Sequence, residues 1–384
     1  MREVAVLGIG QIPAGEHWDQ SLRVMAGDAV LLAMADAGVE SVSGLFVGNM
    51  MSGAANHQQH LGSYIADWVG LKHVSAMKIE AACGSGAAAF RAAMIAVASG
   101  TMDAAIAVGV EKMTDSPGAE ITAELATAAD ADWELDMGVS FVALNALIMQ
   151  RYMHEYGWKH EHFAPFSINA HANAVHNPYA RFHEVLSEAR YKKAPMVADP
   201  INLMDASPMA DGAAAAVLVP AEMLRARGQR VIQVVASSAA TDTIAVHHRR
   251  DPLWLAAAER SAHEAYRQAG IGPENIDLFE VHDAFSIMAA LSLEASGFAE
   301  RGQGPRLALD GEIRLDGRIP IATRGGLKAR GHPVGATGMY QLVEVVQQLR
   351  GEAGETQVAD ARVGMAQNIG GSGSNVLTHI LRVS

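Results

Sequence analysis

The two halves of this chain of 384 residues repeat one order of structural elements. In the first half a helix-like run at 21–37 ends in Ala-Gly and is followed by a short polar link and an apolar run at 44–47. In the second half the helix-like run 256–269 also ends in Ala-Gly, and the strand-like run 276–281 follows a similar link. Helices that alternate with apolar strands are typical of α/β units around a largely buried sheet. The repetition therefore predicts an α/β fold built from two duplicated halves.

The repetition continues into glycine-rich junctions between strand and helix. The segment Cys83-Gly84-Ser85-Gly86 opens an alanine-rich helix, and the strand-like run 104–110 follows it. The segment 331–338 also opens a helix, and the strand-like run 361–366 follows. Glycine allows the sharp backbone turns that such junctions need. The two junctions therefore occupy equivalent places in the two halves.

The duplication also sets the domain boundaries that we predict. The N-terminal half is 1–228 and the C-terminal half is 229–384. An unduplicated stretch at about 115–200 lies within the first half and holds many aromatic residues and histidines. A polar and aromatic insertion of this kind is a typical place for substrate-binding loops. We therefore expect a loop domain at these positions.

A single cysteine and an acidic charge balance exclude several classes of protein. One cysteine forms no intramolecular disulfide and no multi-cysteine zinc site, and the histidines show no metal-binding pattern with carboxylates, so we predict no metal. The formal net charge of −13 argues against general nucleic-acid binding. No apolar stretch approaches the length of a membrane span, and the start of the chain reads as a strand rather than a signal peptide. We therefore expect a cytoplasmic protein that binds neither nucleic acid nor a membrane.

Cys83 lies at the first of the two glycine-rich junctions. Its small neighbours expose the sulfur, and a helix that begins there supplies backbone N–H groups and a positive dipole end, which favour thiolate over thiol. A thiolate can attack a thioester or ketone carbonyl and form a covalent acyl intermediate. The alternative is a buried core cysteine, and these residues by themselves do not decide between the two.

His332 lies at the second junction, between Gly331 and Pro333. Proline near the first helical position fixes the imidazole at a helix start. Because this position is the counterpart of Cys83, the two side chains would face one shared cleft. The alternative is a helix-capping or packed histidine.

Two further segments follow strands of the second half. His282 comes directly after the run 276–281, where an imidazole can act as acid or base or polarise a carbonyl oxygen. An ordinary surface ion pair with Asp283 is the alternative. The glycine-rich segment 368–374 can aim backbone N–H groups at an oxyanion, or it is a simple turn.

Together these motifs resemble the thiolase family. The similarity covers nearly the whole chain and rests on four segments: Cys83-Gly84-Ser85-Gly86, Asp211-Gly212-Ala213-Ala214-Ala215, His282-Asp283-Ala284-Phe285 and Gly331-His332-Pro333. The pattern is most similar to archaeal-type and sterol-carrier-type acetyl-CoA C-acetyltransferases, whose third segment begins with His rather than Asn. The resemblance implies a five-layered αβαβα fold, a homodimer or homotetramer, and CoA thioesters as substrates with no further cofactor.

The resemblance also implies roles for individual residues. Cys83 would be the acyl-accepting nucleophile, and His332 would activate its thiol. His332 and His282 would form an oxyanion hole for an enolate, and the backbone N–H groups of Cys83 and Gly370 would form a second one around the acyl group. Two residues match contacts to CoA: Ser207 and Met137.

One departure from the family pattern concerns the second catalytic cysteine. Thiolases usually carry it in a turn near the C-terminus, where this chain has Asn368, and sterol-carrier-type members carry it where this chain has Ala284. Both positions are closed to thiol chemistry. His332 or His282 must therefore move the α-proton of acetyl-CoA, and an imidazole has a suitable pKa for that role.

These observations lead to a hypothesis of an acetyl-CoA C-acetyltransferase that condenses two acetyl-CoA to acetoacetyl-CoA and CoA, or catalyses the reverse thiolysis. One alternative is a longer-chain 3-oxoacyl-CoA thiolase or another C-acyltransferase that uses Cys83. A second is a non-catalytic scaffold subunit, which the missing second cysteine suggests. The resemblance further implies a place in isoprenoid synthesis, with a small zinc-ribbon/OB-fold protein and a hydroxymethylglutaryl-CoA synthase as partners.

Overall fold

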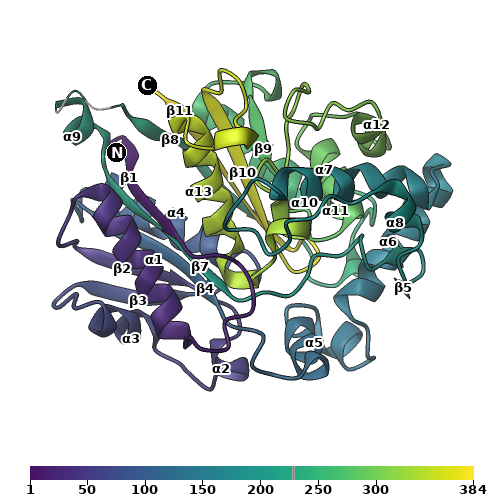
Figure 1. The fold of residues 1–384 in the computed structure, drawn as a ribbon, viewed down its shortest axis with the longest axis horizontal. Coiled ribbons are helices and arrows are strands. Elements are labelled where there is room, and N and C mark those ends of the chain that lie inside the picture. The colour runs from purple at the N-terminus through teal and green to yellow at the C-terminus, as the bar shows by residue number, and fades with distance from the viewer. Residues whose placement is uncertain (227, 229) are drawn as a thin grey trace.

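Each half of the chain forms one half of a mixed sheet, and the two half-sheets join through β1 and β8, close to the two termini (Figure 1). The computed structural model describes residues 1–226, 228 and 230–384, and within them nine strands pair in the order β3-β2-β4-β7-β1-β8-β11-β10-β9. β1 (Val4–Gln11) and β8 (Ile232–Thr241) pair antiparallel through three residues each, and this short ladder joins the halves.

The N-terminal half contributes the first five strands of that order. Besides β1 they are β2 (Gly44–Gly48), β3 (Ser75–Ile79), β4 (Ala105–Glu111) and β7 (Gly212–Pro220). Its helices are α1 (Leu22–Ala37), α2 (Ser52–Ala55), α3 (Leu61–Trp68), α4 (Ser85–Ala98) and α9 (Ala221–Ala226). The predicted boundary at 228/229 falls between α9 and β8, and residue 229 itself lies outside the described residues.

The C-terminal half supplies the remaining four strands. After β8 they are β9 (Leu278–Glu280), β10 (Val363–Gly370) and β11 (Asn375–Val383). Its α-helices are α10 (Ala256–Ala269), α11 (Ser286–Ala295), α12 (Gly304–Leu309) and α13 (Thr337–Arg350). Shorter helical turns are η3 (Val246–His248), η4 (Pro273–Asn275), η5 (Gly326–Arg330), η6 (Val334–Ala336) and η7 (Gly354–Thr356).

The helices form layers on both sides of the half-sheets. α1 packs on β1, β4 and β7 on one outer face, and α10 packs on β8 and β11 on the other. α4 and α13 pack against each other in the middle, where α4 covers β2 and β4 and α13 contacts both β10 and β7. Alanine and β-branched residues fill these interfaces, which allows the helices to lie close to the strands. The predicted αβαβα order of layers is therefore confirmed.

The central helices approach each other closely at their N-terminal ends. A Cβ atom at Gly338 would lie 2.5 Å from the backbone nitrogen of Ala87, and one at Gly86 would lie 2.9 Å from the carbonyl oxygen of Gly335. Any side chain at either glycine would force the helices apart. The two glycines thus bring the starts of α4 and α13 together, and with them the two predicted junctions.

The insertion at about 115–200 contributes no strand to the nine-stranded order described above. It contains α5 (Gly118–Ala126), η1 (Ala131–Leu135), α6 (Phe141–Tyr156), η2 (His160–Phe163), α7 (Ala164–Ala174), α8 (Glu188–Lys192) and β5 (Met196–Ala198), which pairs with β6 (Ile201–Asn202). α6 and α7 pack against α11. Among the described residues, no helix is both long and apolar enough to cross a membrane.

Candidate active site

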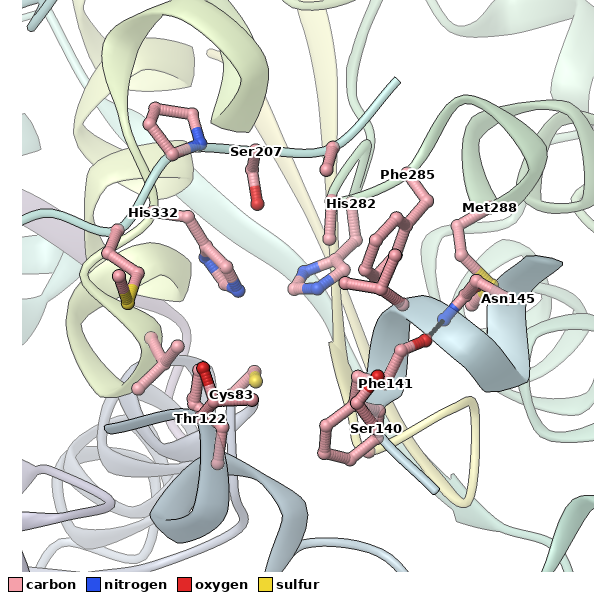
Figure 2. A pocket seen from close by; sticks show the side chains of 18 of the residues that line it. Cys83, Thr122, Ser140, Phe141, Asn145, Ser207, His282, Phe285, Met288 and His332 are labelled. Carbon is pink, nitrogen blue, oxygen red and sulfur yellow. Dashed lines mark hydrogen bonds between the residues drawn. The ribbon is translucent and has the colours of Figure 1, made fainter. Parts of the chain in front are cut away.

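A cavity of about 240 Å³ holds the three residues predicted to carry the chemistry. Figure 2 shows Cys83, His282 and His332 around one space, with Ser207 beside the histidines. Cys83 comes from the N-terminal half and the histidines from the C-terminal half, so neither half forms the site by itself. α5, the start of α6 and the start of α11 contribute to the rest of the wall, which is mostly apolar.

A strained turn places Cys83 directly before α4. Ala82 has a φ of +50°, which residues with a side chain rarely adopt. The Ser85 hydroxyl fixes the turn, because it accepts from the Ala81 N–H over 2.9 Å and donates to the Ala82 carbonyl over 2.6 Å. Strain of this kind is found mainly where the surrounding structure holds a functional group in place. Cys83 retains accessible surface on the cavity, which an inert core cysteine would lack.

The electrostatic surroundings keep Cys83 as a neutral thiol. Burial and, after it, the nearby carboxylate of Glu111 raise the pKa of the Cys83 thiol to about 12, against the opposing effect of the backbone N–H groups of Cys83 and Gly371. The predicted net preference for the thiolate is therefore wrong for the resting protein. The backbone N–H groups favour the thiolate as expected, but desolvation of the sulfur outweighs them. A base must remove the proton before the sulfur can react.

His332 has the proton arrangement of such a base. Its Nδ1 lies 2.7 Å from the Thr337 hydroxyl, which in turn donates to the Pro333 carbonyl over 3.2 Å. Since the hydroxyl proton is committed to the carbonyl, the hydroxyl oxygen accepts from Nδ1–H, and Nε2 is left with a free lone pair. Burial, followed by the neighbouring His282 and Arg330, lowers the pKa of His332 well below its usual value. The imidazole is therefore neutral at physiological pH and able to accept a proton.

His282 has the opposite arrangement. The side-chain amide of Asn368 donates to Nδ1 of His282 over 3.1 Å, so the ring proton resides on Nε2. Burial lowers the pKa of His282 to about 3, and Arg330 adds to the effect. His282 is 3% exposed, and Asp283 accepts from the Leu327 N–H instead of forming a surface pair with it. The interpretation of His282 as a surface ion-pair residue is therefore wrong.

The two imidazoles lie next to each other with complementary functions. Their ring centroids are 5.2 Å apart and the ring planes are inclined by 84°. His332 offers a proton acceptor and His282 offers a neutral N–H donor. A neutral donor can stabilise a developing oxyanion while its neighbour accepts a proton.

The glycine-rich segment 368–374 is part strand and part turn. β10 continues to Gly370, and the turn begins at Gly371. A Cβ atom at Gly370 would lie 2.5 Å from the Ala81 carbonyl oxygen, so this glycine allows the strand to approach the cysteine turn. Gly371 lines the cavity, and its backbone N–H is close enough to the thiol of Cys83 to lower its pKa. Gly371, rather than the predicted Gly370, is thus the glycine beside the sulfur.

The two predicted CoA contacts lie in different surroundings. Ser207 lines the cavity, and its backbone N–H donates to the Ala284 carbonyl over 2.8 Å, which holds it beside His282. Met137 is 68% exposed and does not belong to the cavity wall. The insertion instead reaches the cavity through Ser140, Phe141 and residues that follow on α6.

Glu111 is a site-related residue that the sequence reasoning missed. It is fully buried at the end of β4, and its carboxylate accepts from the backbone N–H groups of Met50, Met51 and Gly335 and from the side chain of Asn49. Gly335 belongs to the C-terminal half, so Glu111 fastens the two halves close to His332. Burial raises the pKa of Glu111 to about 7, against these hydrogen bonds. The sequence does contain a sign of this role, because Glu111 ends an otherwise apolar strand. A buried charge at such a place is destabilising unless hydrogen-bond donors or an opposite charge compensate it.

Two family models together match most of the chain. Residues 7–222 match the family described as thiolase, N-terminal domain, and residues 238–383 match the thiolase C-terminal domain-like family. The chain therefore belongs to the thiolase family, and it is an acyltransferase.

Similarity to known proteins extends over the whole chain. The acetyl-CoA acetyltransferase of Methanothermobacter thermautotrophicus is 47% identical over 382 residues, which cover 99% of each chain. Human sterol carrier protein 2 is 29% identical over 398 residues, covering 98% of this chain and 72% of the relative. A solved structure described as the Ltp2-ChsH2(DUF35) aldolase superposes with a TM-score of 0.87 at 24% identity, covering 99% of this chain and 98% of that one. The predicted resemblance to archaeal-type and sterol-carrier-type members is confirmed.

Proposed function

We propose that the chain is an acetyl-CoA C-acetyltransferase, which joins two acetyl-CoA into acetoacetyl-CoA and CoA, or catalyses the reverse thiolysis, through an acyl-Cys83 intermediate. The name of the archaeal relative supports the substrate. The observation that carries the mechanism is the meeting of Cys83, a neutral base on His332 and a neutral donor on His282 in one cavity. This chemistry needs no cofactor beyond the CoA thioesters.

The first half-reaction transfers an acetyl group to Cys83. Nε2 of His332 takes the thiol proton while Sγ attacks the carbonyl carbon of acetyl-CoA. The resulting oxyanion accepts hydrogen bonds from the backbone N–H groups of Cys83 and Gly371, the latter in place of the predicted Gly370. The bond between the carbonyl carbon and the CoA sulfur then breaks, and His332 returns its proton to the departing CoA.

The second half-reaction forms the carbon–carbon bond. His332, neutral again, removes an α-proton from a second acetyl-CoA, and the enolate oxygen accepts a hydrogen bond from Nε2–H of His282. The enolate carbon attacks the acetyl carbonyl on Cys83. The C–S bond to Cys83 breaks, acetoacetyl-CoA is released, and the Cys83 sulfur recovers the proton held by His332. One sulfur and two imidazoles therefore suffice, and no second cysteine is needed.

Incubation of the protein with acetyl-CoA tests this function. We expect release of free CoA, an acetyl group on the peptide that contains Cys83, and formation of acetoacetyl-CoA. The Cys83→Ala variant should show none of the three. Condensation by Cys83→Ala, or the absence of both acetylation and product in the parental protein, would refute the proposal.

The cavity also favours a second candidate, a thiolase for longer acyl chains. Beyond His282 the wall is mostly apolar and includes Phe285 and Met288, which leave room for an acyl chain longer than acetyl (Figure 2). A comparison of kcat/KM for thiolysis of acetoacetyl-CoA and 3-oxohexanoyl-CoA distinguishes the two. A higher value for the longer substrate would support this candidate.

We also propose a homo-oligomer that forms through the edge strand β3. Because β3 ends the order of strands, one side of its backbone has no neighbouring strand within the described residues, and Met77 on it is 45% exposed. Unpaired edges of this type readily pair with another strand. A second copy of the chain would cover the edge and the methionine together.

The proposed setting is cytoplasmic isoprenoid synthesis, with a zinc-ribbon/OB-fold protein and a hydroxymethylglutaryl-CoA synthase as partners. The archaeal relative supports the reaction on which this setting depends, and the solved neighbour, described as the Ltp2-ChsH2(DUF35) aldolase, is named for two components. Size-exclusion chromatography of the chain mixed with each purified partner tests the assembly. Separate elution of all components at micromolar concentration would contradict it.

A further inference from the structure

The side of the cavity away from His332 contains one buried polar group that the proposed reaction does not use. Asn145 on α6 lines the cavity and is 2% exposed. Figure 2 shows it beside Phe141, Phe285 and Met288, on the opposite side of His282 from His332. A few polar groups in a mostly apolar wall are the usual arrangement for fixing the orientation of a ligand.

The hydrogen bonds of Asn145 determine which of its atoms is available. Nδ2 donates to the Phe141 carbonyl over 2.9 Å, one turn earlier on α6. A carbonyl can only accept, so this contact fixes the amide with its nitrogen toward Phe141 and its oxygen free. Oδ1 has no hydrogen-bond partner within residues 1–226, 228 and 230–384. The side chain therefore keeps a buried, unsatisfied acceptor within the wall of the cavity.

An unsatisfied buried acceptor is costly, and a ligand that supplies an N–H or O–H donor to it removes that cost. A leucine of similar size at position 145 would suit the neighbouring Phe141, Phe285 and Met288 better. An acceptor in this position strengthens the binding of a ligand that has a hydrogen-bond donor there and weakens the binding of a ligand that lacks one. The local packing thus points to a ligand with an N–H or O–H group at this place.

We propose that Oδ1 of Asn145 is a substrate-binding acceptor for a hydrogen-bond donor of the bound CoA thioester. This inference rests on the proposed function, since the ligand is the same thioester. The donor has two sources: an amide N–H of the pantetheine arm, which every CoA thioester carries, or a hydroxyl of the acyl chain. Asn145 therefore selects substrates in addition to the apolar wall around it.

Calorimetric titration of the Cys83→Ala protein, which prevents turnover, tests the proposal. The variants are Asn145→Leu and Asn145→Ala in that background, and the control is Gln150→Ala, an exposed amide on the same helix. If the donor is the pantetheine amide, both Asn145 variants bind CoA about tenfold more weakly and bind adenosine 3′,5′-bisphosphate, which lacks that arm, unchanged. If the donor is an acyl hydroxyl, both Asn145 variants bind 3-hydroxybutyryl-CoA about tenfold more weakly and bind butyryl-CoA with unchanged affinity.

Each comparison uses two ligands on one protein, so a general loss of folding would weaken both ligands equally. Unchanged binding of CoA and 3-hydroxybutyryl-CoA by both Asn145 variants would overturn the inference and leave the proposed function intact. An equal loss for CoA and for adenosine 3′,5′-bisphosphate would also overturn it. Failure of the Cys83→Ala protein itself to bind any CoA thioester would overturn the proposed function and this inference with it.

Discussion

The side-chain amide of Asn368 donates a hydrogen bond to Nδ1 of His282 over 3.1 Å, and both residues are buried. Asn368 stands where most thiolases have their second cysteine. The substitution therefore does more than remove a thiol, because the asparagine holds the neighbouring imidazole as the tautomer with its proton on Nε2. In the proposed mechanism, this preorganised N–H group of His282 is the donor to the enolate oxygen.

Asn368→Asp should reverse this tautomer. A carboxylate accepts from Nδ1–H, which leaves Nε2 of His282 without the proton that the enolate oxygen needs. We expect kcat for condensation to fall about 100-fold, the usual cost of one oxyanion donor. Acetylation of Cys83, which depends on His332, should fall far less. Rapid-quench measurement of the two half-reactions checks this, with Asn368→Ala as the variant that removes the donor without adding charge. An equal fall in the rates of acetylation and condensation would contradict the assignment of acetylation to His332 and of enolate stabilisation to His282.

The roles of the two histidines can be separated directly. His332→Ala removes the base for the thiol, so we expect acetylation of Cys83 to slow by about 10²–10⁴-fold, the range for general-base catalysis. His282→Ala should still form acetyl-Cys83 but should lose exchange of the α-protons of acetyl-CoA with deuterium. Mass spectrometry of the Cys83 peptide and NMR of the exchange distinguish these outcomes. Acetylation of His332→Ala at the parental rate would show that another group activates the thiol.

Glu111→Gln should make Cys83 more acidic. The carboxylate raises the pKa of the thiol, which lies at about 12, and Glu111 itself has a pKa raised to about 7, so it is charged above that pH. Removing this negative charge stabilises the thiolate. Alkylation by iodoacetamide, which follows the thiolate fraction, should therefore become about threefold to tenfold faster at about pH 9. The matched control is Glu80→Gln, because Glu80 is the weaker of the two carboxylates that raise the Cys83 pKa.

The same variant tests a pH dependence of stability. The pKa of Glu111 is raised by folding, so the native state holds its proton between about pH 4.5 and 7 while the unfolded chain has released it. The stability contributed by this group is complete below that window and is lost as the pH rises through it. The parental free energy of unfolding should fall across the window more steeply than that of Glu111→Gln. Parallel curves in urea titrations at several pH values would contradict the shift.

The sequence predicts the framework well and the finer placement of groups less well. The run 256–269 matches α10 (Ala256–Ala269), because its amphipathic pattern identifies the helix and the glycine that follows it marks the C-terminal end. The run 361–366 is too short for β10 (Val363–Gly370), since Asn368 to Gly370 pair with β11 despite the turn propensity of glycine. Ladder pairing is a tertiary effect that local propensity does not include.

Within the site, sequence reasoning finds the residues that sit at chain junctions and misses those that act through burial. Cys83 and His332 can be found in the sequence because each lies in a glycine-rich segment between a strand and a helix. The neutral state of the thiol is not visible, because the dipole of α4 can be read from the sequence but the desolvation of the sulfur cannot. The sequence does not reveal Asn145 for the same reason. Its place among apolar side chains in the cavity wall is set by the packing of α6 against α11.

A lysine at position 77 should weaken the proposed oligomer. Met77 is 45% exposed on β3, the strand at the end of the sheet, and a charge on an edge strand opposes pairing with a second copy. Light scattering after size exclusion should give at least twice the monomer mass for the parental protein and a value close to one monomer for Met77→Lys at micromolar concentration. The control is Leu32→Lys on α1, a site of similar exposure at 49%, which should leave the mass unchanged. If Leu32→Lys dissociates the protein and Met77→Lys does not, the interface lies on α1, and β3 is left free for another partner.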